Sequence, residues 1–155
     1  MQQLVELLKE RQLTIASCES LTGGLFCSSL TQIPGVSAVL KGGVVTYWTE
    51  IKEKVVHVSE ETVAAYGVVS AQTAYEMAVN VQKLFDTDVA VSFTGNAGPD
   101  VMEGKPAGSV YTCIAIKDKT YGFHDLIKAE RNEVRMIIVE KTTERIKELL
   151  INGSI

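Results

Sequence analysis

With 155 residues, of which 46% are hydrophobic and 22% charged, the chain is long enough for one globular domain with a substantial core, and this composition excludes a disordered protein. The net charge of −4 and the lack of a basic run argue against nucleic acid and anionic membranes as partners. No apolar run approaches the roughly 20 residues that span a bilayer, and the charged N-terminal segment is unlike a signal peptide. We therefore expect a cytoplasmic protein.

The first third of the chain alternates between helix and strand patterns. Apolar residues at positions 4, 5, 7 and 8 predict a helix, and the run from Leu13 to Cys18 predicts a short buried strand. A helix over 24–33 should end at Pro34. The β-branched and aromatic run 38–48 predicts a strand that is bent or bulged at Gly42 and Gly43.

The remaining two thirds continue the alternation and end differently. We expect a helix from about Thr49, a second one opened by a capping box at Ser59, and a third that runs from a cap at Ser70 to about Phe85. Residues 88–95 predict a buried strand, 108–116 and 120–127 a hairpin, and 131–150 a long amphipathic helix.

These elements together predict one α/β domain over residues 1–155. Strands that alternate with helices, followed by a late hairpin, are typical of a three-layer α/β/α sandwich around a mixed, mostly parallel sheet. Three cysteines in apolar patterns, Cys18, Cys27 and Cys113, predict free thiols. His57 and His124 have no partner at ligand spacing, so we expect neither a metal nor another cofactor.

Functional residues of such sheets gather at the carboxyl ends of the strands. Three segments have this position: 19–24, 47–52 and 94–99. Each joins hydroxyl groups or glycine to a strand end, which suits a ligand with a phosphate because backbone N–H groups can approach it closely. The sequence therefore predicts a site for a nucleotide-sized molecule.

Each residue in these segments also has a simpler interpretation. Ser20 and Thr22 are good helix caps, and a serine before a helix is far more often a cap than a nucleophile. Lys52 lies among charged neighbours and resembles a solvated helix residue. Arg131 and Arg135 have i, i+4 spacing, which suits a surface pair as well as a shared anion contact.

Five short sequence blocks favour the functional interpretation of these residues over the simpler one. They are "CESLTGG" (18–24), "GGVVTYWTEIK" (42–52), "TGNAGPD" (94–100), "GKPAGSVY" (104–111) and "RNEVR" (131–135). In their order and separation they resemble the CinA C-terminal domain family, whose enzymatic members are nicotinamide mononucleotide deamidases. The resemblance covers nearly the whole chain, which looks like a stand-alone version of that domain.

The resemblance implies hydrolysis of the carboxamide of nicotinamide mononucleotide to nicotinate mononucleotide and ammonia. It implies Ser20 as the nucleophile, Lys52 as the group that activates it, and Tyr47 as a supporting hydroxyl. A serine needs such a base, and a lysine can serve once desolvation lowers its pKa. No metal is required, and backbone N–H groups at the glycine turn would hold the oxyanion. The family also commonly forms homo-oligomers, which we expect here.

By the same resemblance, a further set of residues binds the substrate. It comprises Thr22, Gly23, Gly24, Gly42, Gly43, Thr94, Gly95, Asn96, Arg131 and Arg135. In this set one of the two arginines meets the phosphate.

The chain departs from the usual family pattern at four positions. Trp48 and Thr49 replace a Ser-Asn pair, Asn96 replaces an aliphatic residue, and Cys18 replaces an alanine. These changes leave two alternatives open. One is a non-catalytic nucleotide-binding or regulatory module, and the other is an amidohydrolase that acts on a different amide.

Overall fold

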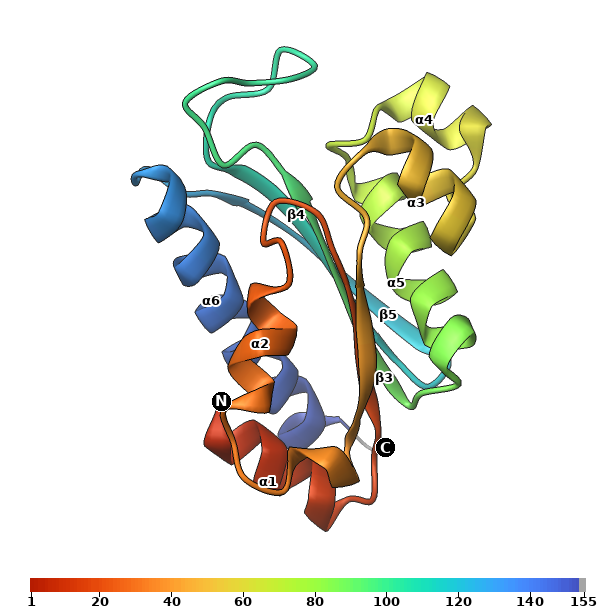
Figure 1. The fold of residues 1–155 in the computed structure, drawn as a ribbon, viewed down its shortest axis with the longest axis vertical. Helices are drawn as coiled ribbons and strands as arrows, with labels where there is room; N and C mark the ends of the chain where they lie inside the picture. The colour runs from red at the N-terminus through yellow and green to blue at the C-terminus, as the bar shows by residue number, and fades with distance from the viewer. Residues whose placement is uncertain (154–155) are drawn as a thin grey trace.

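The computed structural model describes residues 1–153, which form a sheet between two layers of helices (Figure 1). The helices are α1 (Gln2–Glu10), α2 (Leu25–Thr31), α3 (Thr49–Val56), α4 (Glu60–Tyr66), α5 (Ala71–Phe85) and α6 (Arg131–Asn152), with a short 3₁₀ turn at Val36–Ala38. The strands are β1 (Ile15–Glu19), β2 (Leu40–Val45), β3 (Val89–Gly95), β4 (Ser109–Ile116) and β5 (Lys119–Leu126).

The sheet has the strand order β2-β1-β3-β4-β5. β1 pairs in parallel with both β2 and β3, whereas β4 runs antiparallel to β3 and to β5. Four strands therefore share one direction and only β4 opposes them. This confirms the expected α/β/α sandwich around a mixed, mostly parallel sheet.

The two faces of the sheet carry separate cores. On one face α1, α2 and α6 contribute Leu4, Phe26 and Ile138 to a cluster with the apolar side chains of β1, β3 and β4. On the other face α5 contributes Met77 and Val81, and α3 and α4 pack against α5. β1 and β3 lie between both layers, and all five residues of β1 are buried, because a strand covered on both faces can carry no solvated side chain.

The predicted elements are confirmed in type, with differences at their ends. β2 stops at Val45, three residues before the predicted strand end, and its pairing with β1 shifts at Lys41, next to the predicted bulge glycines. Ser59 does cap α4, since its side chain accepts from the Thr62 amide. The carboxylate that receives the Ser59 amide comes from Glu76 of α5, not from within α4.

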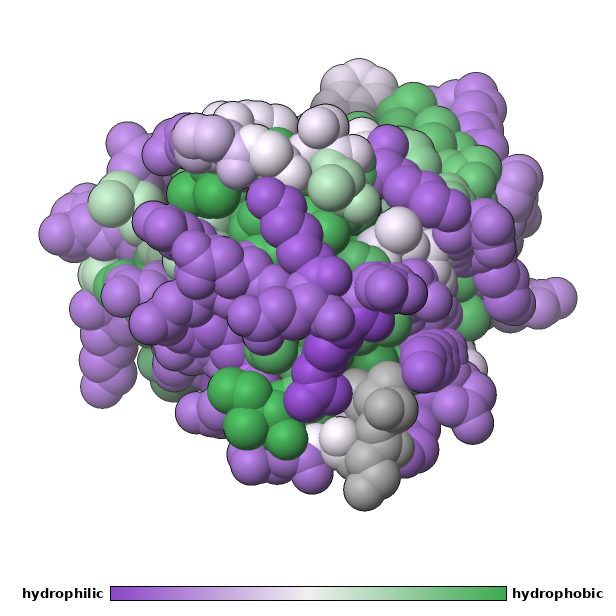
Figure 2. Space-filling model, turned by 90° about the horizontal axis from the view of Figure 1, so that it is seen from below, coloured by the Kyte–Doolittle hydropathy of each residue, from purple (hydrophilic) through white to green (hydrophobic). Residues whose placement is uncertain are grey.

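The two ends of the sheet are covered by different parts of the chain. The carboxyl ends of β1, β2 and β3 meet at the end that also carries the long connection 96–108, at the top of Figure 1. The opposite end, seen in Figure 2, is covered mainly by hydrophilic side chains. Among the described helices, none is both long enough and apolar enough to cross a membrane.

Candidate functional site

Ser20 is the first residue after β1. Its amide donates to the Phe93 carbonyl of β3 at 3.0 Å, so the backbone is held by the sheet up to the point where the hydroxyl projects. The side chain is only 8% exposed and faces a cavity. Helix α2 begins after Gly24, and no side chain caps it from that position. Ser20 is therefore not the cap of the helix that follows it.

Glu19 takes over the capping role. Its buried carboxylate accepts the amides of Gly24, Phe26 and Cys27 at 2.9–3.1 Å. A carboxylate at a helix N-terminus satisfies backbone donors that would otherwise lack partners, and it also complements the helix dipole. The turn between β1 and α2 is thus closed by the neighbour of Ser20, and the Ser20 hydroxyl is left for other contacts.

Lys52 of α3 makes the contact that defines the site. Only 2% of this lysine is exposed. Its Nζ donates to Ser20 Oγ at 2.9 Å. It also donates to two backbone carbonyls that precede α3, Thr46 O at 2.6 Å and Tyr47 O at 3.1 Å. A protonated ammonium has three N–H groups, and here each has one acceptor.

Burial changes the acidity of the groups around this contact. It lowers the pKa of Lys52 from 10.5 to about 8, because desolvation penalises the ammonium form. The neighbouring Cys18 thiol responds in the opposite sense: burial raises its pKa to about 11, so it stays neutral at physiological pH. Lys52 can therefore lose its proton near neutral pH, which a solvated lysine cannot do.

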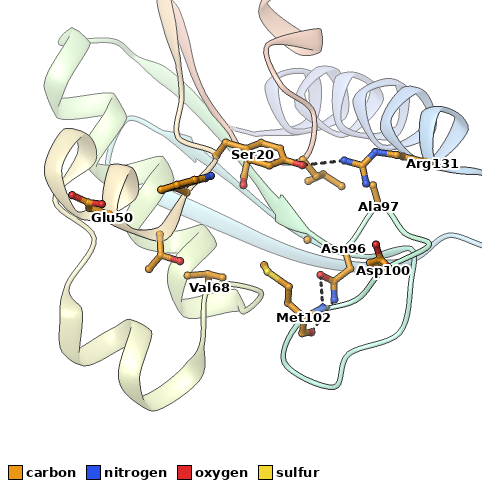
Figure 3. A pocket seen from close by; sticks show the side chains of 13 residues that line it. Ser20, Glu50, Val68, Asn96, Ala97, Asp100, Met102 and Arg131 are labelled. Atoms are coloured by element: carbon orange, nitrogen blue, oxygen red, sulfur yellow. Dashed lines mark hydrogen bonds between the residues drawn. The ribbon is translucent and has the colours of Figure 1, made fainter.

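A cavity of about 580 Å³ opens in front of Ser20 (Figure 3). Its walls come from the β1–α2 turn, the start of α3, the α4–α5 connection, the connection after β3 and the start of α6. The lining residues are Ser20, Leu21, Tyr47, Trp48, Thr49, Glu50, Val68, Gly95, Asn96, Ala97, Asp100, Met102 and Arg131. Ligand pockets commonly have volumes of about 300–1,000 Å³, and this cavity falls within that range.

Tyr47 and Arg131 form one polar side of the cavity. The Arg131 guanidinium donates to Tyr47 Oη at 2.9 Å and to the Gly98 carbonyl at 2.8 Å. Two contacts leave further N–H groups of this arginine for a ligand. Tyr47 thereby connects the two ends of the site, because its carbonyl accepts from Lys52 and its hydroxyl accepts from Arg131.

Of the predicted binding residues at the end of β3, two line the cavity and one supports it from behind. Gly95 and Asn96 line the cavity, whereas Thr94 lies beneath it and donates to the Val68 carbonyl at 2.7 Å. The Asn96 amide group bonds to the backbone of Met102 and Lys105, so it holds the connection 96–108 in shape (Figure 3). The asparagine at this position is therefore engaged in shaping one wall of the cavity.

The other predicted binding residues lie behind the cavity or away from it. Arg135 donates to the Thr22 carbonyl at 3.0 Å and braces the turn that contains Gly23 and Gly24, outside the cavity lining. Thr22 Oγ1 is buried and has no hydrogen-bond partner among the described residues.

Gly42 and Gly43 lie in the middle of β2 and do not line the cavity. A Cβ atom on Gly42 would meet the Phe85 ring at 2.7 Å, and one on Gly43 would meet Ser17 Oγ at 2.5 Å. Their lack of side chains is explained by this packing.

Several lining residues had no signal in the sequence. Val68 and Met102 belong to irregular connections, where no periodic pattern marks a position as facing a site. Trp48, Thr49 and Glu50 lay inside the second candidate segment, but only the departure from a family pattern drew attention to the first two. Within residues 1–153, no three His, Cys, Asp or Glu side chains are grouped as metal ligands would be.

Comparison with known proteins agrees with this architecture. The family model described as the CinA C-terminal domain matches residues 1–150. The chain belongs to the CinA C-terminal domain family. A competence-damage inducible protein of Listeria welshimeri is 41% identical over 145 residues, which are 93% of this chain and 35% of the relative. One from a Geobacillus strain is 47% identical over 133 residues, 85% of this chain and 32% of the relative.

Solved structures of the CinA superfamily have the same fold. A superfamily protein of Klebsiella pneumoniae matches with a TM-score of 0.95 at 27% identity, over 97% of this chain and 94% of that one. A competence/damage inducible protein of Agrobacterium tumefaciens matches with a TM-score of 0.90 at 31% identity, over 95% and 91%. This CinA domain spans about a third of the length of the curated relatives it matches, and nearly all of these solved chains.

Proposed function

We propose that this CinA domain is a metal-independent amidohydrolase that converts nicotinamide mononucleotide and water to nicotinate mononucleotide and ammonia. The observation that carries the proposal is the 2.9 Å contact between Lys52 Nζ and Ser20 Oγ at the wall of the cavity, with the lysine buried and its pKa lowered to about 8. A serine hydroxyl is a weak nucleophile without an adjacent base, and this contact supplies one.

The two carbonyls around Lys52 orient its lone pair. When the ammonium loses a proton, two N–H groups remain, and the carbonyls of Thr46 and Tyr47 are the two fixed acceptors for them. The lone pair then faces Ser20 Oγ and can accept the hydroxyl proton. The backbone thus selects the orientation in which Lys52 acts as a base.

The reaction proceeds in two halves. In the first, Lys52 takes the Ser20 proton as Oγ bonds to the carboxamide carbon, and the lysine then gives that proton to the amide nitrogen as the C–N bond breaks and ammonia leaves. In the second, water attacks the acyl-enzyme, Lys52 takes a proton from it, and the proton returns to Ser20 Oγ as the acid is released. Every proton is returned, and no redox partner is needed.

The donors for the oxyanion differ from those expected at the glycine turn. The Gly24 amide is bound to Glu19, and the Gly23 amide donates to the Ser20 carbonyl. Among the described residues, the amides of Leu21 and Thr22 donate to no protein acceptor. Of these two residues, only Leu21 lines the cavity, and it directly follows the nucleophile. We therefore assign the oxyanion to the Leu21 amide, since the charge develops next to Ser20 Oγ.

Arg131 is the residue we assign to the phosphate. It lines the cavity and keeps free N–H groups, whereas Arg135 is engaged with Thr22 and lies outside the lining. Planar guanidinium groups suit phosphate oxygens because they can donate two parallel hydrogen bonds. Homo-oligomerisation belongs to this proposal as well, since β2 and β5 leave two strand edges for a second copy.

The test is ammonia release from nicotinamide mononucleotide by chelator-treated protein. Ser20→Ala should lower kcat by at least about 10³-fold, because it removes the nucleophile. Ser28→Ala, an exposed serine on α2, is the matched control and should keep full activity. A loss of only a few-fold in Ser20→Ala would refute the mechanism. Binding of the mononucleotide without any turnover in the unaltered protein would favour the non-catalytic module.

A panel of amides tests the substrate. Nicotinamide, nicotinamide riboside and nicotinamide mononucleotide differ only in the ribose and the phosphate. If Arg131 binds the phosphate, kcat/KM should be highest for the mononucleotide. Equal or better turnover of another amide would support the amidohydrolase with a different substrate.

A further inference from the structure

Trp48 combines an anchored backbone with an open side chain. Its carbonyl accepts the amides of Ile51 at 3.1 Å and Lys52 at 3.2 Å, so the residue caps the helix that carries the base. The indole is 71% exposed and lines the cavity. The fixed backbone and the place of the ring in the lining make this indole an aromatic surface that a bound molecule can reach.

The indole has no aromatic or cationic partner within residues 1–153. The ring pairs there are Phe26 with Phe93 and Tyr111 with His124, and the cations over rings lie at Tyr111 and Phe123. One other aromatic side chain lines the cavity, Tyr47, and its hydroxyl is engaged with Arg131. Trp48 therefore presents the aromatic face that is open to a bound molecule.

The charged side chains of the cavity lining distinguish its two sides. Arg131, at one side of Figure 3, is the single Lys or Arg in the described lining. The lining has two carboxylates: Asp100 lies on the Arg131 side of that view, and Glu50 lies on the opposite side. Glu50 is two residues along the chain from Trp48, belongs to the same helix as Lys52 and is paired with the exposed Lys54. An anionic group at Arg131 thus leaves the other end of the ligand near the indole and a carboxylate.

A ring that carries positive charge fits this second end. The pyridine nitrogen of the mononucleotide is bonded to ribose, so its ring is a pyridinium cation, and tryptophan is the aromatic side chain that binds cations best. The reacting carboxamide is attached directly to that ring. When it reaches Ser20, the ring must lie close to the segment that holds Lys52, and Trp48 is part of that segment.

We propose that the Trp48 indole is the surface on which this domain stacks a cationic ring, and that it makes the site selective for N-alkylpyridinium amides over neutral pyridine amides. The proposal rests on the proposed function. It assigns the specificity of the site to a residue that is absent from the usual family pattern.

Fluorescence tests binding directly, because Trp48 is the one tryptophan of the chain. The tryptophan emission of the Ser20→Ala protein is titrated with nicotinamide mononucleotide, with the N-methylnicotinamide cation and with neutral nicotinamide. We expect saturable quenching by the mononucleotide. The cation should bind at least about fivefold more tightly than neutral nicotinamide, from which it differs by one methyl group and one charge.

Kinetics tests the specificity. Trp48→Leu should raise KM for the mononucleotide about tenfold (about 1.4 kcal/mol) and lower kcat less than threefold, and Trp48→Phe should recover most of the loss. Tyr75→Leu removes an exposed aromatic side chain that lies on α5, outside the cavity lining, and serves as the control. The preference for the cation over neutral nicotinamide should disappear in Trp48→Leu, a change that general loosening of the fold would not produce.

The outcomes separate the two proposals. The protein could release ammonia while no pyridine compound alters its tryptophan emission and Trp48→Leu leaves KM unchanged. That result would overturn the role of Trp48 and leave the proposed amidohydrolase activity intact. Emission that is already shielded and insensitive to ligand would mean that another copy of the chain covers the indole, which also overturns it. Saturable quenching by the pyridinium compounds without ammonia release would support the stacking surface and refute the reaction.

Discussion

The pH dependence of kcat/KM depends directly on the burial of Lys52. With a pKa of about 8, about one tenth of the molecules hold the free amine at pH 7, compared with about 3 in 10,000 for a lysine at 10.5. Burial therefore raises the fraction of active base about 300-fold at pH 7. Because the base form is the active one, kcat/KM should rise about tenfold between pH 7 and pH 9 and level off above that.

The assay measures nicotinate mononucleotide by chromatography, which is independent of the ionisation of ammonia. Lys52→Arg keeps the positive charge but cannot supply a free base, since the pKa of arginine exceeds 12. Its activity should be at least about 10³-fold lower, with no rise toward pH 9. Lys54→Arg changes an exposed lysine of the same helix and should keep the full profile. A flat profile in the unaltered protein, or one with its midpoint above pH 10, would refute Lys52 as the base.

Three further predictions concern stability, measured by urea unfolding. Glu19→Ala leaves three helix amides without their acceptor and should lower the free energy of unfolding by about 2–4 kcal/mol; a loss under about 0.5 kcal/mol would contradict its capping role. Gly108→Ala should cost at least about 2 kcal/mol, because φ is +82° and a Cβ would lie 1.9 Å from the Ile127 carbonyl oxygen; an unchanged midpoint would show that the turn can relax. Asp125, 7% exposed and bound by Arg145 at 2.6 Å, has a pKa held below its ordinary 3.8 by its two cationic partners despite burial, so its stabilisation should be present at neutral pH and lost as pH falls below about 4. Asp125→Asn should therefore be less stable at pH 7 and approach the unaltered protein at pH 3, and a constant difference would count against this reading.

Much of the fold could be predicted from the sequence because its signals are local. Ile15, Ala16 and Cys18 of β1 lie in the run that predicted a buried strand, and Ser70 caps α5 through its own side chain three residues from the Thr73 amide. Such features depend on neighbours within one turn or one strand. The end of β2 was less accurate, because the aromatic residues 47 and 48 favour a strand by composition but lie where the sheet ends and the site begins.

The site was predicted in part. Features that follow from the order of the strands could be predicted, whereas contacts between side chains far apart in the sequence could not. The segments that meet at the cavity could be placed from the rule that strand ends share one edge of the sheet. The sequence could not show which arginine faces the cavity, because Arg131 and Arg135 are one helical turn apart. They differ only in their tertiary contacts: Arg131 donates to the Gly98 carbonyl and Arg135 to the Thr22 carbonyl. A glycine required for packing, such as Gly43 against Ser17, has the same sequence signal as one required for binding.

The sequence by itself determined the order and type of the elements, since hydrophobic periodicity, caps and turn residues act over a few positions. The tertiary structure alone decided that Ser20 and Lys52, 32 positions apart, are in contact. That contact depends on the register of two parallel strands, in which Glu19 pairs with Val45 so that the next residues leave the sheet side by side. Burial then lowers the pKa of the lysine, and desolvation is a property of the packed environment that residue type does not encode.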